Sequence, residues 1–172
     1  MRIASALAGI AALAVSTAAF AAPVTIAPVS FSDELQREIA EDYGAREGEY
    51  LQRTVNEALT AALSERGATV AAGAPLTVEV TIVDADPNRP TMEQLRRRPG
   101  LDAIRSISVG GAELHAVLRT TDGQTVGEVS HRRYDQDIRD LSGAEMTWSE
   151  ARRVIRQFAN KVADAYATNA AH

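Results

Sequence analysis

The sequence predicts a two-layer α+β domain, in which a mixed but mainly antiparallel sheet carries two long amphipathic helices on one face. Apolar residues recur every three or four positions over 49–66 and again over 147–166, which indicates two helices with one buried side each. Between them, apolar and polar residues alternate from Leu76 to Ile82, as in a strand with one wet face. The order of strand, helices, strands, hairpin and closing helix fits helices packed on one sheet.

The beginning of the chain has the pattern of a cleavable export signal. A positive start at Arg2 precedes an apolar stretch over 3–15, well short of the roughly 20 residues that cross a bilayer. Ala19 and Ala21 provide the small residues that signal peptidase needs at the third and first positions before its cut. We therefore predict a signal peptide over 1–21, cleaved after Ala21, and a single periplasmic domain over 22–172.

The composition of this domain excludes several classes of protein. Removing 21 of the 172 residues leaves 151, with 17 basic and 23 acidic side chains and a formal charge of −6. Such a chain is a poor nucleic-acid binder, because that function needs a cationic face. Cysteine is absent, which leaves no disulfide, no thiolate site and no lipidated cysteine as an anchor. No later apolar stretch has spanning length, so we predict a soluble protein without membrane span or lipid anchor.

The first part of the domain is expected to contain a strand and a short helix before the first long helix. Apolar residues nearly alternate over 24–31 with a phase break at Pro28, which indicates a strand that is bulged or at an edge. Ser32 can cap a helix over 34–42, which we expect on the surface because few of its residues are large and apolar. The long helix is expected to end at Gly67.

A long excursion then interrupts the sheet. Residues 86–101 contain three prolines, and Thr91 with Gln94 makes a capping-box pattern for one or two helical turns. We expect the chain to return to the sheet at Ile104. The apolar residues that follow fall on odd positions before the glycine pair 110–111 and on even positions after it. We interpret this change of phase as a β-bulge, because glycine tolerates the backbone angles of a bulge.

The last third of the chain is predicted to form a hairpin and a helix. Asp122-Gly123 is a hairpin turn signal, and the strand over 124–134 is expected to be bulged or at an edge. Thr147 and Glu150 form a capping box at the beginning of the last helix. Trp148, the only tryptophan, either anchors a partner or packs the helix entry onto the body, and we favour the second interpretation.

Two histidines, His115 and His131, lie on the two arms of this hairpin. A two-residue turn would pair His115 with Ser130 and place the imidazoles on opposite faces, whereas a three-residue loop could set them side by side. A small enzyme or ligand-binding protein with a site near these histidines is therefore the alternative function. Two histidines without a third ligand make a poor zinc site, so we predict no metal, cofactor or catalytic residue.

Arginines are concentrated on the excursion. Arg96, Arg97 and Arg98 are consecutive, and Arg89 and Arg105 lie nearby. Guanidinium groups pair bidentately with carboxylate and phosphate, so these five residues are the candidate partner-binding site. The alternative is that arginine is the default surface cation here, since the chain has 17 arginines and one lysine.

Several short motifs resemble the small envelope proteins of Gram-negative bacteria. They are Val-Thr-Ile-Ala-Pro-Val at 24–29, the helix end at 66–68, the stretch 105–114 and the turn at 121–123. That group includes uncharacterised lipoproteins and auxiliary lipoproteins of ABC transporters, and the resemblance implies a non-enzymatic module that supports transport or envelope assembly. This chain differs in lacking the anchoring cysteine. The sequence thus predicts a non-enzymatic periplasmic accessory module, whose partner is an envelope protein or an anionic envelope component.

Overall fold

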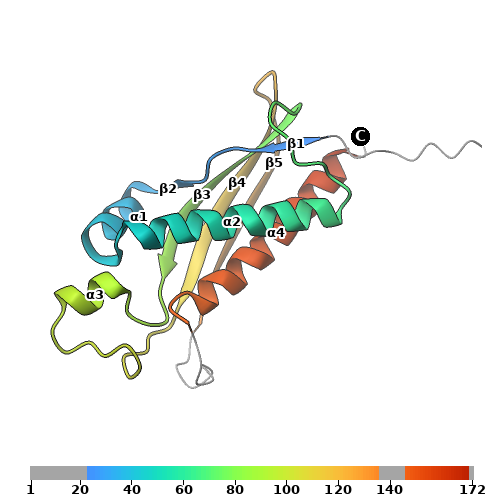
Figure 1. The fold of residues 1–172 in the computed structure, drawn as a ribbon. Helices are drawn as coiled ribbons and strands as arrows, with labels where there is room; N and C mark the ends of the chain where they lie inside the picture. Colours follow the sequence, from blue (N-terminus) through green and yellow to red (C-terminus); the bar gives the residue numbers. More distant parts are fainter. Residues whose placement is uncertain (1–22, 136–145, 171–172) are drawn as a thin grey trace, which may run out of the picture.

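The computed structural model describes residues 23–135 and 146–170, which form one mixed sheet and a set of helices (Figure 1). The predicted signal peptide lies outside the described residues. In chain order the elements are β1 (Val24–Ile26), β2 (Ser30–Phe31), α1 (Asp33–Glu38), the π-helical turn η1 (Ile39–Tyr43), α2 (Ala45–Glu65), β3 (Leu76–Asp86), α3 (Met92–Arg97), β4 (Gly111–Thr120), β5 (Thr125–Tyr134) and α4 (Ser149–Ala170).

The sheet has the order β1-β3-β4-β5, and β2 pairs with β3 beyond β1. Both short strands run parallel to β3, whereas β3, β4 and β5 are antiparallel neighbours. The predicted mixed α+β architecture is confirmed. The single strand expected over 24–31 is instead two short strands, because the chain leaves the ladder around Pro28.

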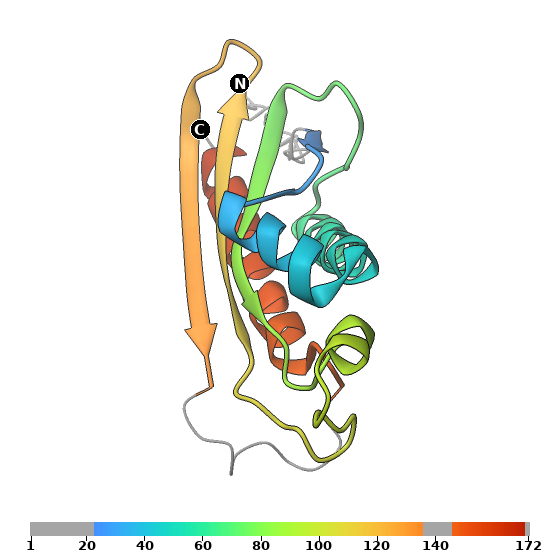
Figure 2. The ribbon, with the colours of Figure 1, turned by 90° about the vertical axis from the view of Figure 1, so that its left-hand side faces the viewer.

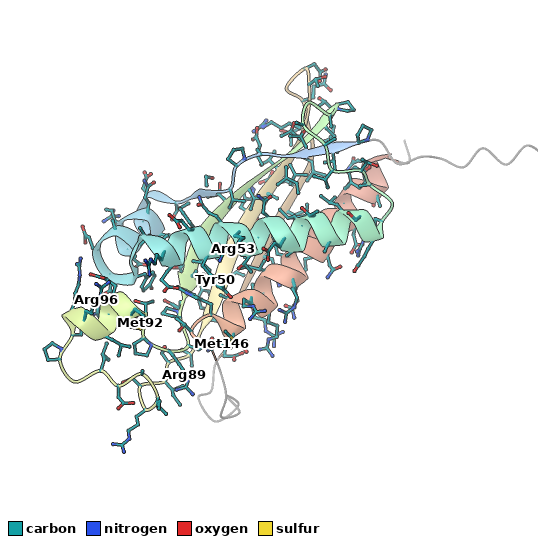
Figure 3. The ribbon with its side chains drawn as sticks, viewed as in Figure 1. Tyr50, Arg53, Arg89, Met92, Arg96 and Met146 are labelled. Atoms are coloured by element: carbon teal, nitrogen blue, oxygen red, sulfur yellow. The ribbon has the colours of Figure 1, made fainter. Side chains whose placement is uncertain are left out.

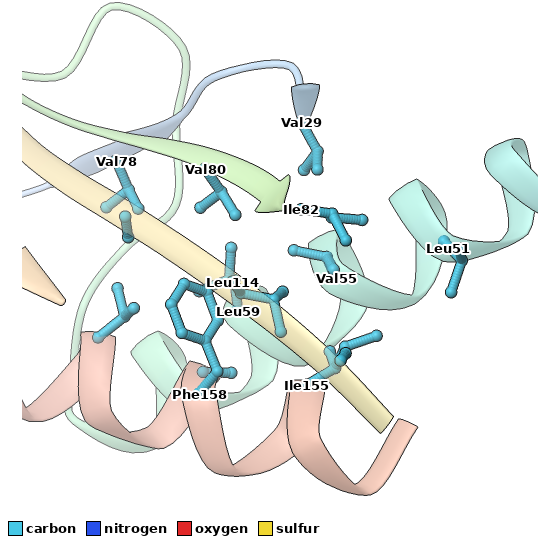
Figure 4. Packing of buried hydrophobic residues seen from close by; sticks show 14 of the residues in the cluster. Val29, Leu51, Val55, Leu59, Val78, Val80, Ile82, Leu114, Ile155 and Phe158 are labelled. Atoms are coloured by element: carbon cyan, nitrogen blue, oxygen red, sulfur yellow. The ribbon is translucent and has the colours of Figure 1, made fainter. Parts of the chain in front are cut away.

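One hydrophobic core joins the two long helices to the sheet. Helix α4 contacts β4 and β5, and α2 packs against α4. The inward side chains of the strands, such as Val80, Ile82 and Leu114, belong to the same buried cluster as Leu59 of α2 and Phe158 of α4 (Figure 4). Among the described residues, none of the helices is long and apolar enough to cross a membrane.

The short helix after β2 lies on the surface and packs one apolar stripe against the body. Ser32 caps it as predicted, accepting a hydrogen bond from the backbone N–H of Leu35 at 3.1 Å. Leu35, Ile39 and Tyr43 are all buried, because their spacing of four places them on one side of α1 and η1. Leu35 is the one buried residue of α1, so the helix lies on the surface as predicted and is held there by this buried stripe. Gly44 ends this segment with φ of 97°, a conformation that favours glycine.

The glycine pair before β4 does not form the predicted bulge. β4 begins at Gly111, and the residues before it lie outside the sheet, with Ile107 and Val109 exposed. A Cβ on Gly110 would lie 2.5 Å from the side chain of Asn88, and one on Gly111 would lie 2.4 Å from the carbonyl oxygen of Arg133. Glycine is thus required at both positions, because the Asn88 side chain and the backbone of β5 approach them too closely for a Cβ. The positions of the apolar residues change phase at this point because residues before Gly110 lie in a loop, whereas those from Gly111 onward lie in β4.

The hairpin places His115 opposite Ser130, as a two-residue turn would, but the route is different. The N–H of Thr120 bonds the carbonyl oxygen of Gln124 at 3.0 Å, so three residues form the loop, and Gly123 has φ of 85°. A register shift then follows between Leu118 and Arg119, where Val126 is the extra residue. The extra loop residue shifts the strand pairing by one position and the bulge shifts it back, so His115 still faces Ser130. This strand was expected to be bulged or at an edge, and the structure shows both features.

Candidate functional site

Residues 87–110, here called the excursion, connect β3 to β4 outside the sheet. Figures 1 and 2 place the excursion beyond the end of β3, at one end of the molecule. Its helix α3 begins with the predicted capping box, because Thr91 and Gln94 each bond the backbone N–H of the other. The side-chain amide of Gln94 also donates to Asp42 of η1 at 2.6 Å. The excursion therefore contains a capped helix, and a side-chain hydrogen bond fixes this helix against η1.

Asn88 fastens the excursion to the beginning of α4. This side chain is completely buried, and its Oδ1 accepts a hydrogen bond from the backbone N–H of Glu150 at 2.9 Å. The backbone of Asn88 accepts from the N–H of Ser108 at 3.0 Å and donates to the carbonyl of Thr147 at 2.7 Å. The predicted capping box between Thr147 and Glu150 was wrong, since α4 begins at Ser149 and Asn88 satisfies the N–H of Glu150.

Trp148 packs the entry of α4 onto the body of the protein. Its side chain is buried, and the ring meets that of Tyr43 edge-on with centroids 5.6 Å apart. The indole N–H donates to Glu47 of α2 at 2.7 Å. This arrangement confirms the structural interpretation of Trp148.

Exposed apolar side chains gather at the excursion end. Among the described residues, the large hydrophobic side chains that are exposed are Met92, Ile104, Ile107, Val109 and Met146. The first four lie on the excursion, and Met146 precedes α4 beside it. Exposure reaches 78% for Ile104 and 68% for Met92. In Figure 3, Met92, Arg89 and Met146 lie at this same end of the molecule. Such a gathering is typical of an interaction surface.

The five arginines of the candidate partner-binding site form ion pairs with only two carboxylates among the described residues. Arg96 and Arg97 both bind Glu93 of α3, and Arg98 binds Asp42 of η1 at 2.6 Å. The guanidinium of Arg89 donates to the carbonyl oxygen of Ile104. Among the described residues, the structure records no ion pair for Arg105. The excursion holds five arginines and two acidic residues, and is thus locally basic on a chain of formal charge −5.

A cleft of about 440 Å³ lies between the excursion and η1. Arg89 and Arg98 line it, and Leu101, Ile107 and Val109 provide apolar wall. The structure thus brings two of the five predicted arginines to one cleft. Its other wall comes from Asp42 and Tyr43, which sequence reasoning missed. The spacing of Tyr43 from Leu35 and Ile39 was the available signal, since it predicts that this aromatic ring faces inward.

Three carboxyl groups, those of Glu38, Asp84 and Asp86, lie close enough to one another to influence their pKa values. Asp84 accepts a hydrogen bond from the Tyr134 hydroxyl. Burial and the charge of Asp84 raise the pKa of Asp86, and burial with both of these carboxylates raises the pKa of Glu38. Burial and these carboxylates also raise the pKa of Tyr43. Of these three carboxyl groups, Asp86 lines the cleft.

The two histidines do not form a joint site. His131 lies opposite Leu114 on the core side of the sheet, and its Nε2 is 3.1 Å from Oε1 of Gln157 on α4. His115 lies on the other face and pairs with Glu128 at 2.8 Å. No group of three or more His, Cys, Asp or Glu side chains in the described ranges is arranged to hold a metal ion.

Comparison with known proteins gives matches to solved structures and to one family. The chain is similar to a PelC dodecamer from Paraburkholderia phytofirmans, with 12% identity, coverage of 84% of this chain and 86% of that one, and a TM-score of 0.46. It is also similar to a minor lipoprotein from Acinetobacter baumannii, with 10% identity, coverage of 87% of this chain and 94% of that one, and a TM-score of 0.40. A third similar structure is a hypothetical protein from Chlamydia trachomatis, with 7% identity, coverage of 84% of this chain and 97% of that one, and a TM-score of 0.45. None of the curated proteins matches the chain.

The family match covers most of the sequence. A profile with the description "Protein of unknown function (DUF3313)" matches residues 14–162, which include the whole sheet and the excursion. The chain therefore belongs to the DUF3313 family.

Proposed function

We propose that the protein is a non-enzymatic periplasmic accessory module, whose excursion contacts a partner in the cell envelope. One observation carries this proposal: the exposed large hydrophobic side chains of the described residues all lie on the excursion or directly beside it. A protein gains nothing in stability from exposing them, whereas apolar side chains interleaved with arginine are common in interfaces. The pattern of the first residues supports export to the periplasm.

The scaffold is suited to this role. We infer that α2 and α4 share one face of the sheet, so that the excursion extends from the end of a rigid two-layer body. Asn88 and the Gln94 contact to Asp42 hold the excursion in place before a partner arrives. A preorganised surface loses less conformational entropy on binding.

The proposal is tested by replacing Arg96, Arg97 and Arg98 together with serine and by chemical crosslinking of intact cells. We expect the crosslinks to the partner to weaken about tenfold, because charge-assisted contacts are lost, while the melting temperature stays close to that of the parent protein. Arg53→Ser is the matched control, since Arg53 is an exposed arginine on α2 away from the excursion (Figure 3). Unchanged crosslinks in the triple variant would remove the arginine patch from the proposal.

A further inference from the structure

The segment 106–110 has the sequence of a strand but is not part of the sheet. Ile107 and Val109 alternate with serine and glycine, yet β4 begins only at Gly111. Ser108 is tied to the body, since its N–H bonds Asn88 and its hydroxyl donates to the carbonyl of Pro87 at 2.5 Å. Among the described residues, the structure records no hydrogen bond for the backbone N–H groups of Ile107 and Val109.

The residues that carry these N–H groups lie at the surface of the molecule. Ile107 and Val109 are exposed and also line the cleft, and Ser108 between them is exposed as well. Backbone donors beside a row of alternating apolar side chains are the feature that an added strand recognises. A hydrocarbon surface, in contrast, offers no acceptor for them.

The charges around this segment favour an acidic ligand. Arg96 and Arg97 share one carboxylate, and their side chains are 72% and 52% exposed. Arg89 and Arg98 line the cleft itself. Asp42 and Asp86 also line the cleft, and Asp42 pairs with Arg98, so the excess of positive charge comes from the excursion as a whole, with its five arginines and two acidic residues. An extended segment with carboxylates could thus meet guanidinium groups and free N–H groups together.

We propose that the excursion binds an extended acidic segment of a partner polypeptide, whose carbonyl oxygens accept from Ile107 and Val109 and whose carboxylates pair with the arginines. This inference rests on the proposed function and names the chemistry of the partner. The apolar side chains of the bound segment lie against Ile107, Val109 and Leu101, and its acidic side chains face Arg89 and Arg98.

Fluorescence anisotropy with a labelled nonapeptide of alternating valine and glutamate tests this inference. A second peptide with lysine in place of every glutamate is the control for charge, and vesicles of phosphatidylcholine and phosphatidylglycerol are the control for a lipid surface. We expect the acidic peptide to bind about tenfold more tightly than the lysine peptide, with an affinity that falls as salt is raised. The Ile107→Asp/Val109→Asp variant should bind it about tenfold more weakly, and Arg53→Ser should bind it normally.

Three results would overturn the inference: equal binding of the two peptides, no binding of the acidic peptide up to about 1 mM, or binding of vesicles alone. Unchanged binding by the double aspartate variant would also overturn it, provided that its melting temperature matches the parent. If these results occur while the triple serine variant still loses its cellular crosslinks, the excursion remains the contact surface and only the chemistry of the ligand is wrong.

Discussion

Replacing Trp148 by alanine is expected to lower the free energy of unfolding by about 3–5 kcal/mol, the usual cost of removing a buried tryptophan or phenylalanine ring. The side chain is only 3% exposed and connects α4 to η1 and α2 through Tyr43 and Glu47. Its loss leaves a cavity at this junction and an acceptor on Glu47 without its donor. Urea unfolding, followed by circular dichroism, measures the change.

Two further variants separate the ring from the hydrogen bond. Trp148→Phe retains most of the buried ring and should cost less than Trp148→Ala, and Glu47→Gln should retain an acceptor for the indole N–H. If Trp148 is a partner anchor instead, Trp148→Ala would abolish cellular crosslinks while the free energy of unfolding changes by less than about 1 kcal/mol.

Replacing Asn88 by alanine is expected to cost about 1–3 kcal/mol of the free energy of unfolding, because the N–H of the buried residue Glu150 loses its acceptor. The same change should loosen the excursion, since Asn88 also reaches the carbonyl of Ser108 through its side chain. Hydrogen exchange of the backbone amides over 87–110 should therefore become faster than in the parent protein. Unchanged exchange there would contradict the role of Asn88 as the fastening point.

Gly110→Ala tests the same contact from the opposite side. A methyl group at this position would lie 2.5 Å from Asn88 Oδ1, so the change should destabilise the parent protein. In the Asn88→Ala background the obstruction is gone, and the cost of Gly110→Ala should be smaller. The two changes are expected to couple by about 0.5–3 kcal/mol in a double-mutant cycle. Simple additivity would show that the two residues do not meet.

The long elements could be predicted because their patterns are local and repeated. Helix α2 and strand β3 each place several apolar residues on one side, and Gly67, with φ of 80°, marks the end of the helix as expected. The phase change at Gly110 was misinterpreted, because an exposed loop with Ile107 and Val109 has the same alternation as a strand. Periodicity reports spacing along the chain and contains no information on whether a neighbouring strand exists.

The candidate site could be predicted only in part. Consecutive arginines are visible in the sequence, but their ion pairs depend on residues from distant elements, such as Asp42, which lies 56 positions before Arg98. The cleft is likewise made by η1 and the excursion, which are separated by α2 and β3. Contacts of this kind follow from the tertiary fold, which propensity and local patterns do not specify.

Site-specific photocrosslinking in cells can show whether the excursion makes the partner contact. A photoreactive amino acid is placed at Met92 or Ile104, which are 68% and 78% exposed, and for comparison at Arg53 on α2 or Glu128 on the open face of the sheet. We expect the same crosslinked partner from Met92 and Ile104 and none from Arg53 or Glu128. Capture of a partner from Arg53 or Glu128, with no crosslink from Met92 and Ile104, would contradict it.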